Sequence, residues 1–187
     1  MALKRLTFVL AAALIGPGTL TFAQAPQPAT APSLVQAPPA QPILDAAVKN
    51  AAAAGKNVFV HFSASWCGWC HKLEKFLATP EGKLLDPYMI DVMLVVQERG
   101  PQKPLEHPGA AEIMKRWGGA GAIPFYVFLD GQGRVLADAN SLPGGGNIGY
   151  PANPVEMKAF DEVLAKGLPK LPADVRAKVI AYIAIHP

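Results

Sequence analysis

Short apolar runs rich in β-forming residues alternate with helical patterns along most of this 187-residue chain. From Val58 onward the predicted order is strand, helix, strand, helix, strand, hairpin, strand and helix. Helices between the early strands imply parallel pairing by right-handed crossovers, and a tight turn at 130–133 adds an antiparallel edge. The expected fold class is therefore α/β, with a mixed central sheet flanked by helices. The predicted strands are 58–62, 91–96, 125–129 and 134–137, and the predicted helices are 43–54, 67–78, 110–117, 155–166 and 171–185.

The first 23 residues have the pattern of an export signal peptide. Lys4 and Arg5 precede an uncharged and mostly apolar run over 6–25, which a Gly-Pro-Gly sequence interrupts at 16–18. We expect cleavage after Ala23. An uncleaved membrane anchor is the alternative, because the run carries no charge.

A spacer and one folded domain are expected after the signal. Residues 24–42 contain six prolines and no charged residue, which is typical of an extended linker. The domain is expected to span 43–187, and its last part, 171–187, forms an appended amphipathic helix. Without 1–23 the chain has 15 basic and 14 acidic residues, a balance that gives no electrostatic footprint for nucleic acid. Two cysteines are too few for a four-cysteine zinc site.

The two cysteines lie where a predicted strand gives way to a predicted helix, in the sequence Ser-Trp-Cys-Gly-Trp-Cys-His at 65–71. Cys67 falls in the first helical turn, where unpaired amides and the helix dipole favour a thiolate and lower the thiol pKa. Cys70 shares an apolar helix face with Leu73 and Leu77 and should point toward the core. An accessible thiolate and a shielded thiol one turn away can close a disulfide and suit thiol–disulfide exchange.

The same segment is open to two other interpretations. Cys67, Cys70 and His71 match the attachment pattern of a c-type haem electron carrier, in which both sulfurs form thioethers and the histidine ligates iron. Small c-type cytochromes are mainly helical, however, whereas this motif follows a β-run. The two sulfurs and one imidazole are also three ligands for zinc or copper, but no nearby residue supplies a fourth.

Trp-Cys-Gly-Trp-Cys after an apolar strand resembles the active-site segment of the thioredoxin superfamily. A second match is Gly-Ala-Ile-Pro-Phe at 121–125, which is similar to the cis-proline loop of that family and precedes a Phe-Leu-Asp-Gly-x-Gly hairpin. The resemblance covers roughly 58–166 and implies a thioredoxin-like fold. It also implies that the Cys67–Cys70 disulfide is the redox-active group and that no cofactor is needed.

The resemblance implies a role for each matching residue. Cys67 would attack a substrate disulfide, and Cys70 would resolve the mixed disulfide. The Ile123–Pro124 bond would be cis and would lie opposite Cys67, although the local sequence alone favours an ordinary trans bond. The implied substrate-binding residues are Trp66, Gly68, Trp69, Ile123 and Pro124.

Three positions depart from the family pattern. Gly68–Trp69 replaces the usual Gly-Pro of thioredoxin proper, so the redox potential cannot be inferred. His61 occupies the position of a buried acid that transfers protons for the inner cysteine, which makes it a candidate for proton transfer; a packed, hydrogen-bonded histidine is the commoner role. The Gly-Gly-Gly-Asn sequence at 144–147 falls where this fold brings a loop near the cis-proline. It is a candidate for the substrate rim or a loop without that role.

The resemblance implies an exported thiol–disulfide oxidoreductase of the bacterial periplasm or cell envelope. We expect a protein-disulfide reductase, because about 40 residues between Lys83 and Pro124 leave no room for the large helical insertion of DsbA-type oxidants. The expected partners are client proteins with disulfides and a dithiol electron donor, for which a membrane reductase is one candidate. We expect no nucleic acid, no metal, and no membrane contact unless the signal stays uncleaved. A thioredoxin-like module that only binds a client is the non-catalytic alternative.

Overall fold

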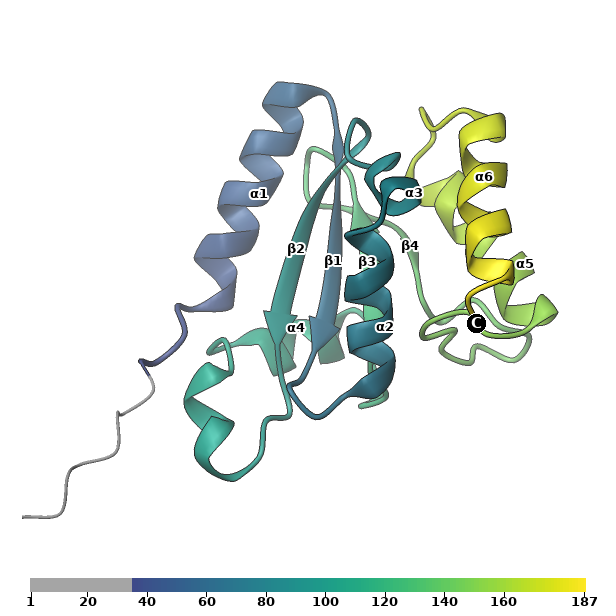
Figure 1. Cartoon of the computed structure of the whole chain (residues 1–187). Helices are drawn as coiled ribbons and strands as arrows, with labels where there is room; N and C mark the ends of the chain where they lie inside the picture. The colour runs from purple at the N-terminus through teal and green to yellow at the C-terminus, as the bar shows by residue number, and fades with distance from the viewer. Residues whose placement is uncertain (1–34) are drawn as a thin grey trace, which may run out of the picture. The chain divides into compact units, whose positions relative to one another are not determined.

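The computed structural model describes residues 35–187, so the expected signal peptide and most of the expected spacer lie outside the described residues. The described part is a four-stranded mixed sheet of order β2-β1-β3-β4 with helices on both faces (Figure 1), which confirms the predicted α/β class. No helix within 35–187 combines the length and the apolar character needed to cross a bilayer. The elements are α1 (Ala40–Ala54), β1 (Asn57–Ser63), α2 (Gly68–Leu77), α3 (Pro80–Lys83), β2 (Met89–Val95), the 3₁₀ helix η1 (Gly100–Leu105), α4 (Ala110–Arg116), β3 (Phe125–Leu129), β4 (Val135–Asp138), α5 (Pro154–Gly167) and α6 (Ala173–Ala184).

The strand directions agree with the sequence pattern at β1 and β2 and differ at β3. β1 and β2 are parallel, with Asn57 opposite Met89. β3 is antiparallel to β1, and β4 is antiparallel to β3. The sequence pattern assigned antiparallel pairing to the final hairpin alone, and it is wrong for β3. The seven residues of α4 span only ~10 Å, whereas a strand as long as β2 spans ~23 Å. The short helix α4 therefore does not return the chain to the opposite end of the sheet. β3 begins at the end of the sheet where β2 finishes, and it runs antiparallel to β1.

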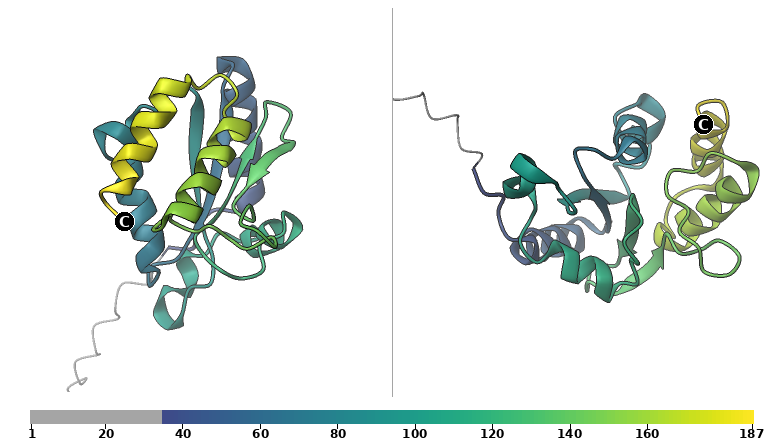
Figure 2. Two further views of the ribbon diagram at one scale, coloured as in Figure 1. Left: turned by 90° about the vertical axis from the view of Figure 1, so that its right-hand side faces the viewer. Right: turned by 90° about the horizontal axis from the view of Figure 1, so that it is seen from below.

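Alternating side chains of β1 and β3 fill two core layers, one on each face of the sheet. Phe59 and Phe128 meet with their ring centroids 4.7 Å apart, and apolar side chains of α2 and α5 cover them. On the opposite face Phe62 contacts Trp117, which follows α4, at a centroid distance of 6.1 Å. Figure 2 shows the sheet between these two groups of helices.

The loop between β2 and α4 is held by contacts that the sequence does not indicate. Ala37 donates a backbone hydrogen bond to Pro104, and Ala40 donates one to Pro108. These contacts order the chain ahead of the first helix, and α1 begins at Ala40, earlier than the pattern starting at Ile43 suggests. His107 of this loop is partly buried, and its Nδ1 accepts a hydrogen bond from the Val95 backbone at 2.9 Å.

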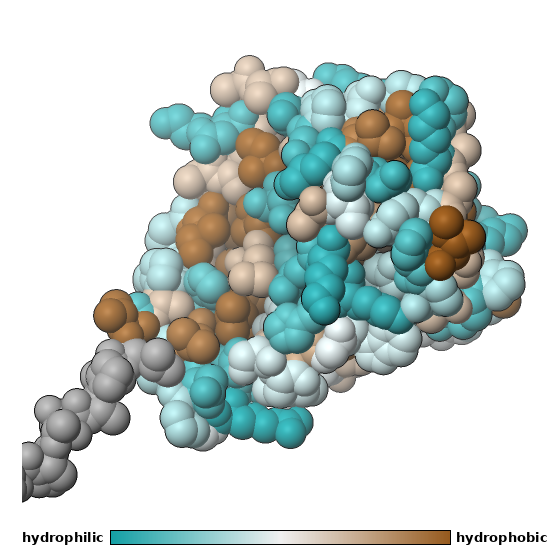
Figure 3. Space-filling model, in the orientation of Figure 1, coloured by the Kyte–Doolittle hydropathy of each residue, from teal (hydrophilic) through white to brown (hydrophobic). Residues whose placement is uncertain are grey.

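Two features of the outer layers are the edge of the sheet at β2 and the added C-terminal helix. β2 is an edge strand, and apolar surface gathers on its side of the molecule between α1 and α2 (Figure 3). Met93 of β2 is exposed. The appended C-terminal helix predicted from the sequence is present as α6. It packs on α5 and α3, and the ring of Tyr182 lies 6.0 Å from that of Phe76 in α2. This packing places the end of the chain beside α2 (Figure 1).

Candidate active site

Cys67 is the N-cap residue of α2. Its backbone is extended, and its Sγ accepts a hydrogen bond from the Cys70 backbone N–H at 3.2 Å. A serine or aspartate oxygen usually fills this role at an N-cap, and here a sulfur does. The unpaired amides and the positive end of the helix dipole therefore act directly on this sulfur and stabilise negative charge on it when the disulfide is open.

A disulfide joins Cys67 and Cys70 across this first turn, with the Cα atoms 5.2 Å apart. Cys70 is fully buried, and its Sγ lies 3.9 Å from the Phe62 carbonyl oxygen. Cys67 is 4% exposed, far less than expected of an accessible nucleophile, because Ile123 packs against it. Cys67 is nevertheless the more exposed of the two cysteines.

The loop before β3 lies against the disulfide. The Ile123–Pro124 bond is cis, and the Ile123 carbonyl oxygen is 3.7 Å from Cys67 Sγ. Asn147 Nδ2 donates to the carbonyl oxygens of Ala122 and Pro124, at 3.3 and 3.1 Å. The loop at 144–147 thus contacts the proline loop through its asparagine. Within residues 35–187 no group pairs with the backbone N–H of Ile123.

Trp66 precedes the disulfide and is held from the end of β2. Its Nε1 donates to the Gln97 carbonyl oxygen at 2.7 Å, and the Arg99 guanidinium lies 4.2 Å from the ring centroid. Gln97 also donates from Nε2 to the Gly121 carbonyl oxygen at 2.9 Å. Gln97 therefore links Trp66 to the loop that carries Pro124. Sequence reasoning missed Gln97 and Arg99, because no motif surrounds them.

Glu98 is a buried carboxylate, 4% exposed, that holds the loop between β1 and α2. Its two oxygens accept hydrogen bonds from the Ser65 backbone N–H at 2.6 Å and from the Ser65 hydroxyl at 2.7 Å. Sequence reasoning missed Glu98 as well. One signal could have identified it: Glu98 follows a predicted apolar strand that pairs with the strand before the cysteine motif, and an acid at such a place is notable because buried acids are rare.

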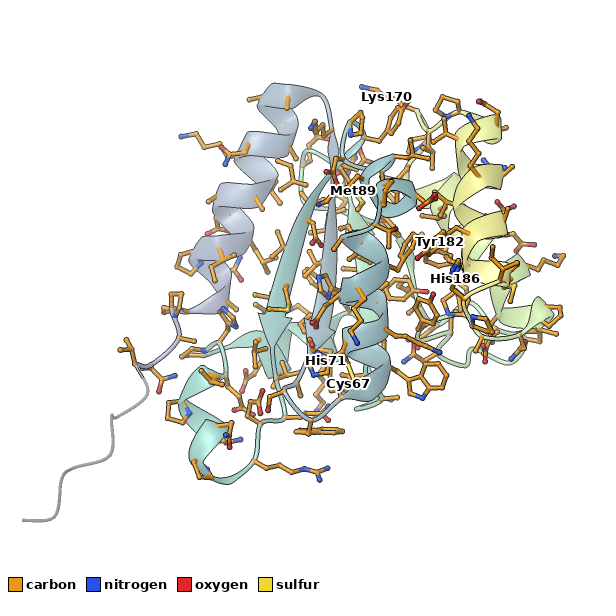
Figure 4. All side chains as sticks on the ribbon, in the orientation of Figure 1. Cys67, His71, Met89, Lys170, Tyr182 and His186 are labelled. Atoms are coloured by element: carbon orange, nitrogen blue, oxygen red, sulfur yellow. A yellow bond between two sulfur atoms is a disulfide. The ribbon has the colours of Figure 1, made fainter. Side chains whose placement is uncertain are left out.

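His71 holds the same loop from the other side. Its Nε2 pairs with the Ser65 carbonyl oxygen at 2.9 Å, and its Nδ1 pairs with the Glu74 carboxylate at 3.2 Å. These two acceptors, the Ser65 carbonyl first, raise the pKa of His71 above its ordinary value of 6.5. His71 and Glu74 lie one turn apart in α2, and both side chains are partly exposed. Figure 4 shows Cys67 and His71 at the same end of α2.

The contacts of His71 bear on the haem and metal interpretations. Both ring nitrogens of His71 already have partners, and the two sulfurs that thioethers would need are joined to each other. Ligation of iron would require breaking these contacts. Residues 35–187 contain no cluster of three or more histidine, cysteine, aspartate or glutamate side chains arranged to hold a metal ion. The geometry therefore favours exchange at the cysteine pair over haem attachment.

His61 is buried in β1, on the face that α2 and α5 cover. Its Nε2 lies 3.2 Å from the Asp91 carboxylate, and its side chain is 2% exposed against 44% for Asp91. Its Nδ1 is buried and has no hydrogen-bond partner within the described residues. The His61 ring thus lies between a partly exposed carboxylate and a buried ring nitrogen that has no hydrogen-bond partner among the described residues.

A groove of about 310 Å³ opens beside the disulfide. Trp69 and Tyr150 form one wall, with their ring centroids 6.4 Å apart, and Ile123 and Pro124 form another. Trp69 is half-exposed, so it offers an apolar surface next to the sulfurs. This volume is at the small end of the ~300–1,000 Å³ typical of ligand sites.

Comparison with known proteins identifies one family model. The model for a thioredoxin-like domain matches residues 44–143, just over half of the chain. No curated protein matches the sequence. Similar solved structures include a disulphide isomerase from Xylella fastidiosa Temecula1, with 16% identity, a TM-score of 0.46 and coverage of 87% of this chain and 97% of that one. DsbH oxidoreductase is 22% identical, with a TM-score of 0.41 and coverages of 78% and 92%. The oxidised C-terminal domain of Neisseria meningitidis DsbD is 19% identical, with a TM-score of 0.37 and coverages of 52% and 80%.

Replacing the buried acid should loosen the loop that carries the motif. We expect Glu98→Ala to lower the free energy of unfolding by about 1–3 kcal/mol, because both hydrogen bonds to Ser65 are lost. Denaturation in urea measures the change. Glu98→Gln, which keeps one acceptor oxygen, should lose less, and the exposed Glu112→Ala is the matched control. Equal midpoints for Glu98→Ala and Glu112→Ala would contradict the role of Glu98.

Two histidines should respond to pH in opposite directions. The raised pKa of His71 means that its stabilisation is complete below pH 6.5 and is lost as pH rises through the folded-state value. Wild type should therefore lose Tm relative to His71→Gln as pH rises. The corresponding loss in the free energy of unfolding should be about 1 kcal/mol or less, because the pair is exposed.

His107 is the matched comparison, because burial lowers its pKa. Protonation then favours the unfolded chain, and wild type should lose Tm relative to His107→Asn as pH falls through 6.5. The asparagine oxygen can still accept the Val95 hydrogen bond. Thermal unfolding from pH 5 to pH 8.5 measures both differences, and slopes of the same sign would refute the assignment.

Proposed function

Because the chain belongs to the thioredoxin-like domain family, we propose that it is a thiol–disulfide oxidoreductase that reduces protein disulfides in the bacterial cell envelope. The observation that carries the proposal is the Cys67–Cys70 disulfide, closed across the first turn of α2 and directly against Ile123. Such a bond can alternate between a dithiol and a disulfide without moving the backbone far, because one helical turn already brings the two sulfurs together.

The proposed reaction begins with both cysteines reduced. The Cys67 thiolate attacks one sulfur of the client disulfide, which forms a mixed disulfide and releases the other client sulfur as a thiolate. Cys70 then loses its proton and attacks Cys67 Sγ, which forms the Cys67–Cys70 disulfide and releases the second client thiolate. The client gains two electrons, and each of its thiolates takes a proton from solvent. A dithiol donor must then reduce the pair again, and a membrane reductase is the candidate.

The client would bind as an extended segment across the proline loop. The unpaired N–H of Ile123 is available to a peptide carbonyl, and Pro124 lies in the groove beside it. The rings of Trp66 and Trp69 border the sulfurs on either side of the motif, and Gly68 leaves open space where a side chain would stand. These contacts support the proposal that the client is bound by five residues: Trp66, Gly68, Trp69, Ile123 and Pro124.

The direction of electron flow and the location are part of the proposal. Reduction is supported by the short connection between α3 and β3, which consists of β2, η1 and α4 and contains no inserted helical domain. Location in the envelope is supported by the pattern of a signal peptide in the sequence of residues 1–23. An exported reductase would need electrons from the cytoplasmic side, which is why a membrane donor is proposed.

We assign the proton acceptor for Cys70 to His61. Cys70 Sγ lies 3.9 Å from the carbonyl oxygen of Phe62, the residue after His61 in β1. The His61 ring makes no direct contact with this sulfur among the described residues, so the proton would pass through one water molecule. Nδ1 of His61 is buried and unpaired, and Nε2 contacts Asp91, whose side chain reaches solvent. A proton taken up at Nδ1 would be balanced by Asp91 and would leave by way of that carboxylate.

Trapping tests the exchange chemistry directly. Cys70→Ala should hold clients as stable mixed disulfides through Cys67, because the resolving sulfur is gone. Cys67→Ser should form none and should reduce insulin at least about 100-fold more slowly than wild type, because it lacks the nucleophile. Non-reducing gels and insulin turbidity measure the two effects.

The alternatives give different results in the same experiments. The double variant Cys67→Ser/Cys70→Ala is the control for non-specific capture. If Cys70→Ala traps no envelope protein and wild type reduces no disulfide, the chain is a binding module and the proposal fails. A Soret band that persists in the denatured protein would replace exchange by haem attachment. Equilibration with glutathione measures the potential, and a strongly oxidising value would reverse the proposed direction.

The role of His61 is tested by the pH dependence of the second step. His61→Asn keeps a polar contact for Asp91 but cannot accept a proton, so release of the client should slow by about 100-fold at pH 7. The loss should shrink toward pH ~8.5, where a thiol ionises without a base. The first attack by Cys67 should keep its rate. A pH profile equal to that of wild type, in a variant of unchanged Tm, would refute the role of His61.

A further inference from the structure

The appended C-terminal segment contacts one wall of the groove. Tyr150 donates a hydrogen bond from its hydroxyl to the His186 carbonyl oxygen at 3.0 Å. Lys72 of α2 donates from Nζ to the Pro187 carbonyl oxygen. The segment 185–187 therefore bridges α2 and the loop that carries Tyr150. The catalytic roles proposed above use none of these contacts.

The segment 185–187 is itself held by α6. The His186 ring stacks on that of Tyr182 at a centroid distance of 4.1 Å, and its Nδ1 donates to the Tyr182 carbonyl oxygen at 2.8 Å. Tyr182 in turn packs on Phe76 of α2. Figure 4 shows Tyr182 and His186 on the side of α6 that faces α2. The end of the chain thus rests on α2 through stacked rings and does not depend on one contact.

The wall that this segment supports is aromatic. Trp69 and Tyr150 stack with an interplanar angle of 22°, and Lys72 Nζ lies 4.8 Å and 5.7 Å from their centroids. Partial burial raises the pKa of Tyr150, so its hydroxyl stays protonated and can donate. The Glu156 carboxylate on the far side of the groove accepts the Ala152 backbone N–H at 2.8 Å. Both charged groups near the groove are therefore engaged, and its open surface is mainly apolar.

We propose that Trp69 and Tyr150 form a subsite for an apolar or aromatic client side chain next to the reacting disulfide, and that residues 185–187 hold this wall in position. The inference rests on the proposed exchange function and specifies which clients the site prefers. Trp69 and Tyr150 are specificity residues, because they line the groove. Lys72 and His186 are positioning residues, because they act through those two rings. An aromatic or aliphatic side chain would stack on the wall, whereas a carboxylate would find Lys72 already engaged with Pro187 and the Glu156 carboxylate lining the same groove.

The test compares disulfide-bridged peptides that differ only at the residue next to the cysteine, either Phe or Asp. Wild type should have a KM about 10-fold lower for the Phe peptide, with similar kcat values. Trp69→Ala should abolish this preference. A chain shortened to end at Ala184 and the variant Tyr150→Phe should each reduce it by about 2- to 5-fold. Tyr88→Phe, at a partly buried tyrosine outside the groove, is the matched control and should keep the wild-type ratio.

A small aliphatic disulfide without a ring, 2-hydroxyethyl disulfide, separates the role of the subsite from the exchange chemistry itself. The chain ending at Ala184 should react with it at the wild-type rate, since only peptide selection depends on the segment 185–187. An unchanged Phe-to-Asp ratio in both the shortened chain and Tyr150→Phe would overturn the role of the segment. An unchanged ratio in Trp69→Ala would overturn the subsite. Wild type that reduces neither peptide nor reagent would instead overturn the exchange function on which the subsite rests.

Discussion

The positive end of α2 acts on a single sulfur, and the arrangement of the site follows from that contact. Cys67 is the N-cap, so the Cys70 amide already points at its Sγ, and the same turn brings the second sulfur within bonding range. A helix N-terminus stabilises whatever negative charge lies on it. Here that charge would appear and disappear as the disulfide opens and closes. The junction between β1 and α2 must therefore be rigid, because a shifted sulfur would lose both the amide and its neighbour Ile123.

Three loops meet at this junction, and a side chain from elsewhere in the chain holds each of them. Glu98 holds Ser65, Gln97 links Trp66 to Gly121, and Asn147 holds the carbonyls on either side of Ile123. These hydrogen bonds thus connect the loops to one another. Hydrogen bonds between loops preorganise a groove before a ligand binds, which lowers the entropy lost on binding.

The C-terminal helix extends this arrangement to the outer layer. α6 packs on α5 and α3, and its end reaches Lys72 and Tyr150 beside the groove. Core packing alone would explain the apolar face of this helix. It does not explain why the last residues turn back onto α2, where they support an aromatic surface next to the reactive sulfurs. With the proposed subsite, the C-terminal segment would give this thioredoxin-like domain a client preference without any change to the cysteine pair.

Local patterns predicted most of the fold. β3 has its predicted bounds, and α2 and α5 each differ from the predicted bounds by one residue at each end. These elements were predictable because hydrophobic periodicity and helix-end residues depend only on a few neighbouring positions in the sequence. The cysteine pair was found for the same reason. The antiparallel direction of β3, the low exposure of Cys67, and the roles of Glu98 and Gln97 were not found. The sequence by itself determined the elements and the reactive pair. Only the tertiary structure decided what surrounds that pair, because hydrogen bonds between residues 20 or more positions apart leave no local pattern to detect.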